Sequence, residues 1–382
     1  MRDGMAALIG AAFVALWPLS SPAQDRLCGL PASGIDDWKI ATQAEAGLDP
    51  RKLCALIDEL DRRDANIHGV VVVRHGALVF EHYRAGPDER WGVDQGRIEH
   101  GPDVKHDLRS VSKSVTSLLV GIALDRKIIS DVDQPVLSYF PDMAALRTPE
   151  KDRITLRHLL TMTSGLAWDE TRPYDREAND ERRMIYSTDP YRFTLGKPVA
   201  AKPGVKWNYS GGDTQLLAGV LQRTSGKFIA DFAKEALFEP LGIRDVEWLK
   251  MPGNGETAAD SGLRSRPRDM ARLGQLVLRH GEWNGRRIVS QAWIDESTRP
   301  HMTGFDSYPS IGYGYQWWTD YEDKDDRRSS WISAQGLGGQ RIYVHPELDL
   351  VVVITAGDYA DDRQDSLPYD IFSRYVITAI RE

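Results

Sequence analysis

The sequence "LRSVSKSVTSLLVGIAL", residues 108–124, begins as a polar turn and continues as an apolar helix. The apolar residues recur with the spacing of one helical face: Val111, Val115, Leu118, Leu119 and Ile122. Ser110 and Lys113 are three positions apart, so their side chains meet in the first turn of this predicted helix.

That position suits a nucleophilic serine. A helix N-terminus offers unpaired N–H groups and a positive dipole end, which stabilise developing negative charge. Burial lowers the pKa of a lysine, so we expect Lys113 to be able to act as a base beside Ser110. The alternative is an ordinary capped helix, because Ser-x-x-Lys arises by chance in most chains of this length.

The composition is that of a soluble globular protein with a large core. The chain has 382 residues, of which 41% are hydrophobic and 27% charged. The formal net charge of −8 excludes a broad basic surface for nucleic acid. Eleven tryptophans are present, and some of those in loop-like stretches could line an apolar cleft: Trp91, Trp168, Trp317 and Trp318.

Residues 1–23 predict a signal peptide, with an apolar run at 5–19 that is too short for a stable span and a cleavage site near Ala23. Asp3 cancels the charge of Arg2, so an uncleaved anchor or a misassigned start codon stays an alternative. Residues 24–45 follow as an N-terminal extension. We expect a periplasmic or secreted protein without stable membrane insertion after cleavage.

The two cysteines, Cys28 and Cys54, could form a disulfide in an oxidising compartment, tying the leading segment to the first helix. Two unpaired thiols are the alternative. Without a third cysteine or a Cys-x-x-Cys pair, cysteine-based redox or zinc chemistry is excluded.

Strand-like segments lie near both chain ends and helical patterns lie between them. Two β-rich runs flank His75-Gly76, a hairpin signal, and residues 340–357 predict a second strand pair. This order predicts an α/β (α+β) fold in which an antiparallel sheet is built from both chain ends and flanked by helices.

The predicted sheet domain comprises residues 46–120 and 265–382, and residues 121–264 form a mainly helical inserted region. Helices are predicted at 48–60 and near the C-terminus. The charged run at 321–328 predicts a solvated loop.

Other catalytic arrangements lack their motifs. There is no Gly-x-Ser-x-Gly and no His-Glu-x-x-His, and the nine histidines are scattered, so we expect no metal site. Residues 336–339 lack the strand-then-helix context of a dinucleotide loop, and no cofactor is predicted. His106 is the one candidate triad partner of Ser110, with loop packing as its alternative.

Several segments, in order, resemble the serine β-lactamase-like, penicillin-recognising hydrolases, most closely the class C branch with family VIII esterases and 6-aminohexanoate-dimer hydrolases. The likeness runs from about residue 46 to 380 and implies a β-lactamase/transpeptidase-like fold. The segments that carry it are "LRSVSKSVTSLLVG", "ITLRHLLTMTSGL", "KPGVKWNYSGGDTQLLAGVL", "SGLRSRPRDMARLGQLVLRHGEWNG", "GYGYQWW" and "AQGLGGQRIYVHPELDLVVVIT".

The resemblance implies that Ser110 is acylated, with Lys113 and Tyr209 as proton-transfer partners; which of the two is the primary base stays open. It places the oxyanion hole at the backbone N–H groups of Ser110 and Leu337. Two residues are candidates for substrate binding: Gly336, where substrate must lie close to the strand, and Gln340, whose alternative is a surface strand position.

Two positions depart from the family pattern. Gly211 stands where the second motif usually has asparagine, and Ala334-Gln335-Gly336 stands where the third usually has a cation. Such a cation holds the substrate carboxylate in penicillin-recognising members, and Arg341 could replace it here. The departures argue for esters or uncharged amides.

The sequence thus predicts an exported serine hydrolase that cleaves small ester or amide bonds through an acyl-enzyme on Ser110, without metal or cofactor. A DD-peptidase, a weak β-lactamase and a non-catalytic penicillin-recognising binding protein are the alternatives. The oligomeric state is not predicted.

Overall fold

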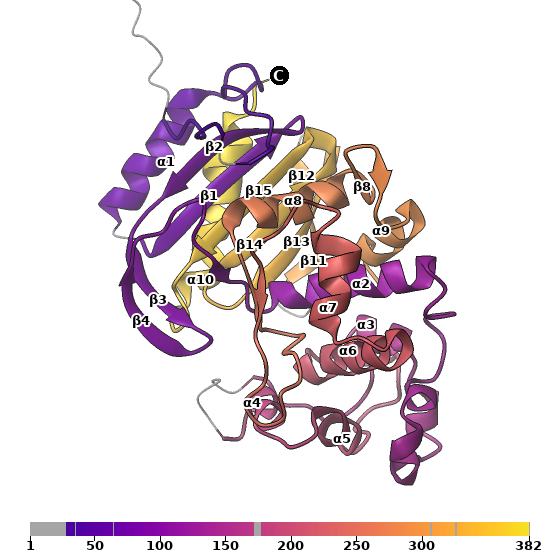
Figure 1. Cartoon of the computed structure of the whole chain (residues 1–382). Coiled ribbons are helices and arrows are strands. Elements are labelled where there is room, and N and C mark those ends of the chain that lie inside the picture. The colour runs from indigo at the N-terminus through magenta and orange to yellow at the C-terminus, as the bar shows by residue number, and fades with distance from the viewer. Residues whose placement is uncertain are drawn as a thin grey trace, which may run out of the picture.

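The computed structural model describes residues 28–381, apart from 35, 64, 172–176, 306–307 and 325–326. The predicted signal peptide lies outside these residues. An eight-stranded antiparallel sheet has the order β10-β11-β12-β13-β14-β15-β1-β2 (Figure 1). Its strands are β1 (Ile67–Arg74), β2 (Ala77–Tyr83), β10 (Met302–Phe305), β11 (Tyr308–Tyr313), β12 (Trp318–Lys324), β13 (Arg327–Gly336), β14 (Gln340–His345) and β15 (Leu350–Ala356). The fold predicted from the two chain ends is confirmed.

The valine-rich strands β1 and β15 pair near the β2 edge of the sheet, with Val71 opposite Val353. Alternate residues of a strand point to opposite faces, so Val70 and Val72 enter one apolar core while Val71 enters the other. Both faces of the sheet are therefore buried. The predicted hairpin between β1 and β2 is confirmed, with His75 and Gly76 both at positive φ.

Helices cover both faces (Figure 1). One face is covered by α1 (Pro50–Arg62) and by α10 (Arg363–Asp370) with its continuation to Val376. Asp49 caps α1 by accepting from the Arg51 N–H, and Pro50 occupies its first turn, so the predicted first helix is confirmed. The other face is covered by α2 (Val111–Asp125), α8 (Pro267–Leu278) and α9 (Gln291–Thr298).

The segment between the two parts of the sheet is mainly helical and lies beyond α2 (Figure 1). Its helices are α3 (Leu156–Leu160), α4 (Asp180–Ile185), α5 (Pro190–Leu195), α6 (Gly211–Ser225) and α7 (Ile229–Ala233). A small sheet of β5 (His106–Asp107), β7 (Leu263–Ser265) and β6 (Glu247–Trp248) joins the start and the end of this segment. Among the described residues, no helix is both long and apolar enough to span a membrane.

Helix α2 is buried on its polar side as well as on the predicted apolar face, because it lies between the sheet and the helical segment. Two of its hydroxyl groups find partners there in the backbone of the helical segment and the sheet. Ser114 Oγ donates to the Gln316 carbonyl at 2.5 Å, and Thr116 Oγ1 donates to the Ala259 carbonyl at 3.1 Å. These bonds satisfy polar groups that burial would otherwise leave unpaired.

Two segments differ from the sequence-based expectation. The polar stretch between β2 and α2, expected to be a loop, contains a hairpin of β3 (Gly86–Arg90) and β4 (Val93–Ile98). The prediction of a loop at 321–328 was wrong for the described residues, because 321–324 belong to β12 and 327–328 to β13, with Asp323 opposite Arg328. Backbone pairing forms such strands without the apolar alternation that marks a buried strand.

Cys28 and Cys54 form a disulfide, with Cα atoms 5.3 Å apart, which attaches the start of the described chain to α1. The N-terminal attachment is thus covalent.

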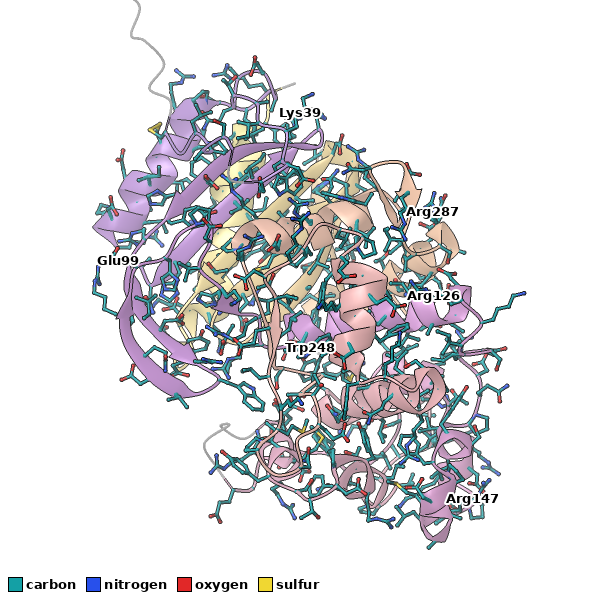
Figure 2. The ribbon with its side chains drawn as sticks, viewed as in Figure 1. Lys39, Glu99, Arg126, Arg147, Trp248 and Arg287 are labelled. Carbon is teal, nitrogen blue, oxygen red and sulfur yellow. A yellow bond between two sulfur atoms is a disulfide. The ribbon has the colours of Figure 1, made fainter. Side chains whose placement is uncertain are left out.

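Charged side chains such as Glu99, Arg126 and Arg147 project from the rim of the molecule (Figure 2).

We expect Cys54→Ser to lower the free energy of unfolding by about 3.5 kcal/mol, since the bond closes a loop of 26 residues in the unfolded chain. Urea unfolding followed by tryptophan fluorescence measures this loss. Wild type unfolded in the presence of a reductant is the control and should match the variant; equal stability of oxidised wild type and variant would contradict the expectation.

Candidate active site

The turn before α2 holds Ser110 in place. Arg109 has a positive φ of 49°, which reverses the chain between Leu108 and the helix. Ser112 Oγ donates to the Arg109 carbonyl at 2.6 Å and accepts from the Leu263 N–H at 3.1 Å, which fastens the turn to β7. Ser110 makes no capping bond with its own helix, so its Oγ is left to face Lys113.

Lys113 lies in the first turn of α2 and is 1% exposed. Its Nζ donates to Ser110 Oγ at 3.2 Å and to the Asp260 carbonyl at 3.2 Å. Tyr209 lies beside it, with its ring centroid 4.8 Å from the same Nζ. The side chains of Tyr209 and Ser110 are hydrogen-bonded.

Tyr209 is positioned by α6, which starts two residues later. Ser210 caps this helix by accepting from the Asp213 N–H at 3.1 Å. The structure therefore brings together the three residues proposed as catalytic from two helix N-termini, about 100 residues apart in the chain.

Three buried carboxyl groups surround Lys113 and were not predicted from the sequence: Glu170, Glu181 and Asp260. Asp260 Oδ2 lies 4.0 Å from Lys113 Nζ. Glu170 Oε2 accepts from Trp168 Nε1 and from the Gly211 N–H, each at 2.7 Å. No motif marks these acids, because they come from three separate segments.

Gly211 has a steric reason to replace the asparagine of the family pattern. A Cβ at this position would lie 2.6 Å from Asp260 Oδ2 and 3.3 Å from Glu170 Oε2. The space of a larger side chain is thus taken by two carboxyl groups.

These acids change the expected protonation of Lys113. Burial opposes its charged form, but the negative charges of Tyr209, Glu170, Asp260 and Glu181 outweigh burial and raise the pKa of Lys113 above its ordinary value. The sequence-based expectation of a lysine with a lowered pKa was therefore wrong. That expectation followed from the burial of Lys113 alone, because the charged groups that surround it are distant in the sequence.

The carboxyl groups and Tyr209 hold their protons more tightly than usual. Burial and the charge of Glu181 raise the pKa of Glu170 to about 7. Burial and the charge of Asp260 raise the pKa of Glu181 to about 8. Burial raises the pKa of Tyr209, while Lys113 opposes this rise. The protonation of each of these groups therefore depends on that of the others.

The end of β13 lies against the turn before α2, residues 108–110, which we call the nucleophile turn. Leu337 directly follows this end of β13. A Cβ on Gly336 would lie 2.2 Å from the Leu108 carbonyl oxygen, so only glycine permits this approach. Gln340 lies inside the sheet instead of facing substrate: it is fully buried, and its Nε2 donates to the carbonyls of Ala356 and Leu337. Its geometry is that of a residue that positions the Leu337 turn.

Arg341 and His106 also have other partners. Arg341 is 3% exposed and donates to the Gly336 and Gln364 carbonyls and to Asp365. This geometry does not replace the cation of the third motif. His106 is buried in β5 and bonds the Asp107 carbonyl and His68, an arrangement that turns its ring nitrogens away from a triad with Ser110.

An aromatic wall stands beside Tyr209, formed by Trp207, Phe305, Tyr313 and Trp318. Trp207 contacts the Phe305 ring edge to face, with centroids 4.7 Å apart, and Trp318 stacks near Tyr209 at 6.2 Å. Of the tryptophans singled out from the sequence, Trp318 belongs to this wall and Trp317 is core. The wall gives the site an apolar side.

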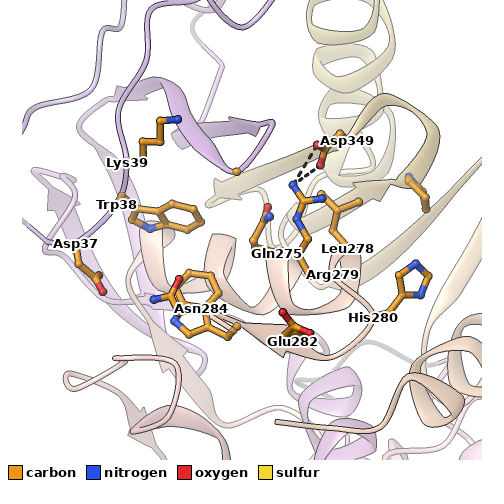
Figure 3. A pocket seen from close by; sticks show the side chains of 13 residues that line it. Asp37, Trp38, Lys39, Gln275, Leu278, Arg279, His280, Glu282, Asn284 and Asp349 are labelled. Atoms are coloured by element: carbon orange, nitrogen blue, oxygen red, sulfur yellow. Dashed lines mark hydrogen bonds and ion pairs between the residues drawn. The ribbon is translucent and has the colours of Figure 1, made fainter. Parts of the chain in front are cut away.

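A hollow of about 750 Å³ lies elsewhere, between α8, residues 37–39 and the β8–β9 hairpin (Glu282–Trp283 and Arg286–Arg287) (Figure 3). Arg279 within it is paired with Asp349 at 2.9 Å. None of Ser110, Lys113 and Tyr209 lines this hollow. It is separate from the site described above.

Comparison with known proteins agrees with this geometry. The profile of the beta-lactamase family matches residues 55–372. The chain is 27% identical over 342 residues to the 6-aminohexanoate-dimer hydrolase of Paenarthrobacter ureafaciens, covering 85% of this chain and 81% of that one. It is 26% identical over 229 residues to esterase EstB of Burkholderia gladioli, covering 58% and 56%. The crystal structure of a family VIII carboxylesterase superposes with a TM-score of 0.63 at 16% identity, covering 85% and 96%. The resemblance inferred from the motifs is confirmed.

Gly336→Ala should reduce hydrolysis of p-nitrophenyl butyrate by about 100-fold, since the added methyl group forces the nucleophile turn and β13 apart. Steady-state kcat/KM measures the loss, and circular dichroism checks the fold. Gly101→Ala is the control, because a Cβ there meets no atom within 4 Å. Unchanged activity of Gly336→Ala would contradict the close approach.

Glu170→Gln should shift the ascending limb of the pH profile of kcat/KM to lower pH by about one unit. The carboxylate of Glu170 raises the pKa of both Lys113 and Tyr209, so its removal lets this pair lose a proton at lower pH. Glu235→Gln, which removes an exposed charge, should leave the profile in place. A shift to higher pH would show that the sign of the coupling is reversed.

Proposed function

Because the chain belongs to the beta-lactamase family and is a serine hydrolase, we propose that it is an exported enzyme that cleaves small esters or uncharged amides through an acyl-enzyme on Ser110. The observation that carries the proposal is the contact of Lys113 Nζ with Ser110 Oγ at 3.2 Å, with Tyr209 bonded to the same serine.

The raised pKa of Lys113 suggests how the proton moves. In the active protonation state the Lys113–Tyr209 pair has lost one proton, and Lys113 favours its ammonium form. Tyr209 then carries the negative charge and accepts the proton as Ser110 Oγ attacks the substrate carbonyl. Tyr209 returns that proton to the leaving group, and water, activated in the same way, releases the acyl group.

The developing oxyanion would be stabilised by two backbone N–H groups. The Ser110 N–H lies at the start of α2, where the helix dipole favours negative charge. The Leu337 N–H follows Gly336, which lies against the nucleophile turn. These two groups are the oxyanion hole that the family resemblance implies.

The proposed substrate class rests on the lack of a free cation at the third motif and on the aromatic wall beside Tyr209. Arg341 is occupied by carbonyls and Asp365, and residues 334–336 supply no cation for a substrate carboxylate. The aromatic wall beside Tyr209 favours an apolar acyl or alcohol group. The names of the two curated relatives, an esterase and an amide-dimer hydrolase, are consistent with this class.

A periplasmic or secreted location forms part of the proposal. The disulfide between Cys28 and Cys54 supports it, because such bonds form and persist in oxidising compartments.

Ser110→Ala should abolish turnover of p-nitrophenyl butyrate and labelling by a fluorophosphonate, because the nucleophilic oxygen is removed. Mass spectrometry of the wild type should place the label on Ser110. Ser373→Ala, at a half-buried serine outside the site, is the control and should behave as wild type. Labelling that survives in Ser110→Ala would overturn the assignment of the nucleophile.

A comparison of two substrates distinguishes the esterase from a β-lactamase and from a non-catalytic binding protein. We expect p-nitrophenyl butyrate to be hydrolysed with a kcat/KM at least about 100-fold above that of nitrocefin, because no cation holds the lactam carboxylate. Preference for nitrocefin would favour a β-lactamase. Lactam binding without turnover or labelling would favour a non-catalytic binding protein.

A further inference from the structure

Three histidines and one aspartate converge at the edge of the sheet near the nucleophile turn. They come from four places in the chain: His68 on β1, Asp88 on β3, His100 after β4 and His106 on β5. One side-chain nitrogen or oxygen of each lies within 4.8 Å of those of the others. The scattered histidines of the sequence gave no indication of this cluster.

Two of the histidines face each other with nitrogens that cannot both be protonated. His68 Nε2 lies 2.9 Å from Asn66 Oδ1, and the Asn66 amide nitrogen donates to the Pro87 carbonyl, which fixes its oxygen toward His68. His106 Nδ1 lies 3.0 Å from the Asp107 carbonyl. Both partners are acceptors, so these two nitrogens carry the ring protons.

The opposite nitrogens, His68 Nδ1 and His106 Nε2, therefore present lone pairs to each other at 2.8 Å. Two facing lone pairs repel unless a cation stands between them. The anchored outer nitrogens match the arrangement that orients histidine ligands of metals, in which the second ring N–H is held by a carbonyl or carboxylate.

Asp88 and His100 complete a four-ligand set. Asp88 Oδ1 lies 3.5 Å from His106 Nε2, and Asp88 Oδ2 lies 3.8 Å from His100 Nε2. Asp88 is itself oriented by the Tyr359 hydroxyl and the Glu89 N–H, which donate to Oδ1 at 2.9 and 2.8 Å. The His100 side chain is 4% exposed, and its Nε2 makes no hydrogen bond within the described part of the chain.

We propose that His68, Asp88, His100 and His106 bind one zinc ion. Three imidazole nitrogens and one carboxylate oxygen form a ligand set that suits tetrahedral Zn²⁺, whose ligand atoms lie roughly 3.3 Å apart at bond lengths of about 2.0–2.1 Å. The ligand atoms are separated by 2.8 Å at the shortest contact and by no more than 4.8 Å, a range that includes this spacing, so side-chain rotations complete the coordination.

Burial supports binding by the imidazoles. The side chains of His68 and His106 are at most 1% exposed, so their ring nitrogens are shielded from competing water. Glu99, next to His100, projects from the rim of the molecule beside β4 (Figure 2).

The ion would hold the β3–β4 hairpin to β1 and to β5, the strand that leads through Leu108 and Arg109 to Ser110. Its role is to position the nucleophile turn. None of Ser110, Lys113 and Tyr209 belongs to the ligand set. The inference stands independently of the substrate proposed above.

The test is metal binding by the full mature protein, stripped with a chelator and then incubated with Zn²⁺. After gel filtration, elemental analysis should find about one zinc per chain, and the Tm should rise by several degrees on loading. Co²⁺ in place of Zn²⁺ should give the visible d–d absorption of a tetrahedral site.

His100→Ala should bind zinc at least roughly tenfold more weakly and lose the zinc-dependent rise in Tm. Its position after β4, outside the strands, makes it the ligand whose loss the fold tolerates best. His280→Ala, an exposed histidine paired with Asp295, is the matched control and should bind like wild type. Ser110→Ala should also bind zinc normally, which separates this test from that of the nucleophile.

Less than about 0.1 zinc per chain in the wild type, or equal binding by wild type and His100→Ala, would overturn the proposal. In that outcome a proton shared between His68 and His106 beside Asp88 satisfies the facing nitrogens instead.

Discussion

Burial of a single ammonium group sets the constraint on which this site depends. Lys113 lies at the junction of the sheet and the helical segment, out of contact with bulk water. A buried cation needs negative partners, and Glu170, Glu181 and Asp260 supply them from three different segments. The helical segment must therefore fold onto α2 for the site to exist. The same charges raise the pKa of Lys113 and favour its ammonium form.

The balance between the acids and Lys113 also explains a local departure from the family pattern. With Gly211 at the start of α6, two carboxyl groups approach the backbone where a side chain would otherwise lie. The carboxyl groups of Asp260 and Glu170 thus take the space of the asparagine side chain that the second motif usually has. The site gains negative charge near Lys113, while the third motif lacks a positive one, and both changes disfavour anionic substrates.

Local patterns in the sequence predicted much of this arrangement. The valine runs of β1 and β15, the His75-Gly76 hairpin and the capped start of α1 follow from periodicity and turn chemistry. Ser110, Lys113 and Tyr209 could be singled out because short motifs carry them. The pKa of Lys113 could not be predicted, since it depends on residues far apart in the chain. The histidine cluster escaped prediction for the same reason, because β1, β3 and β5 place its members together only in three dimensions.

The pairing of β1 with β15 has a consequence for how the protein is made. Val71 pairs with Val353 between neighbouring strands near one edge of the sheet, so β1 and β15 cannot pair until nearly the whole chain has been synthesised. Closing such a long loop is costly in entropy and makes folding slow. Incomplete chains would expose the valine-rich edge of β1, which is a template for aggregation. A chain that stays unfolded until its last strands are available avoids that hazard, and passage through a membrane in an unfolded state would impose the same order.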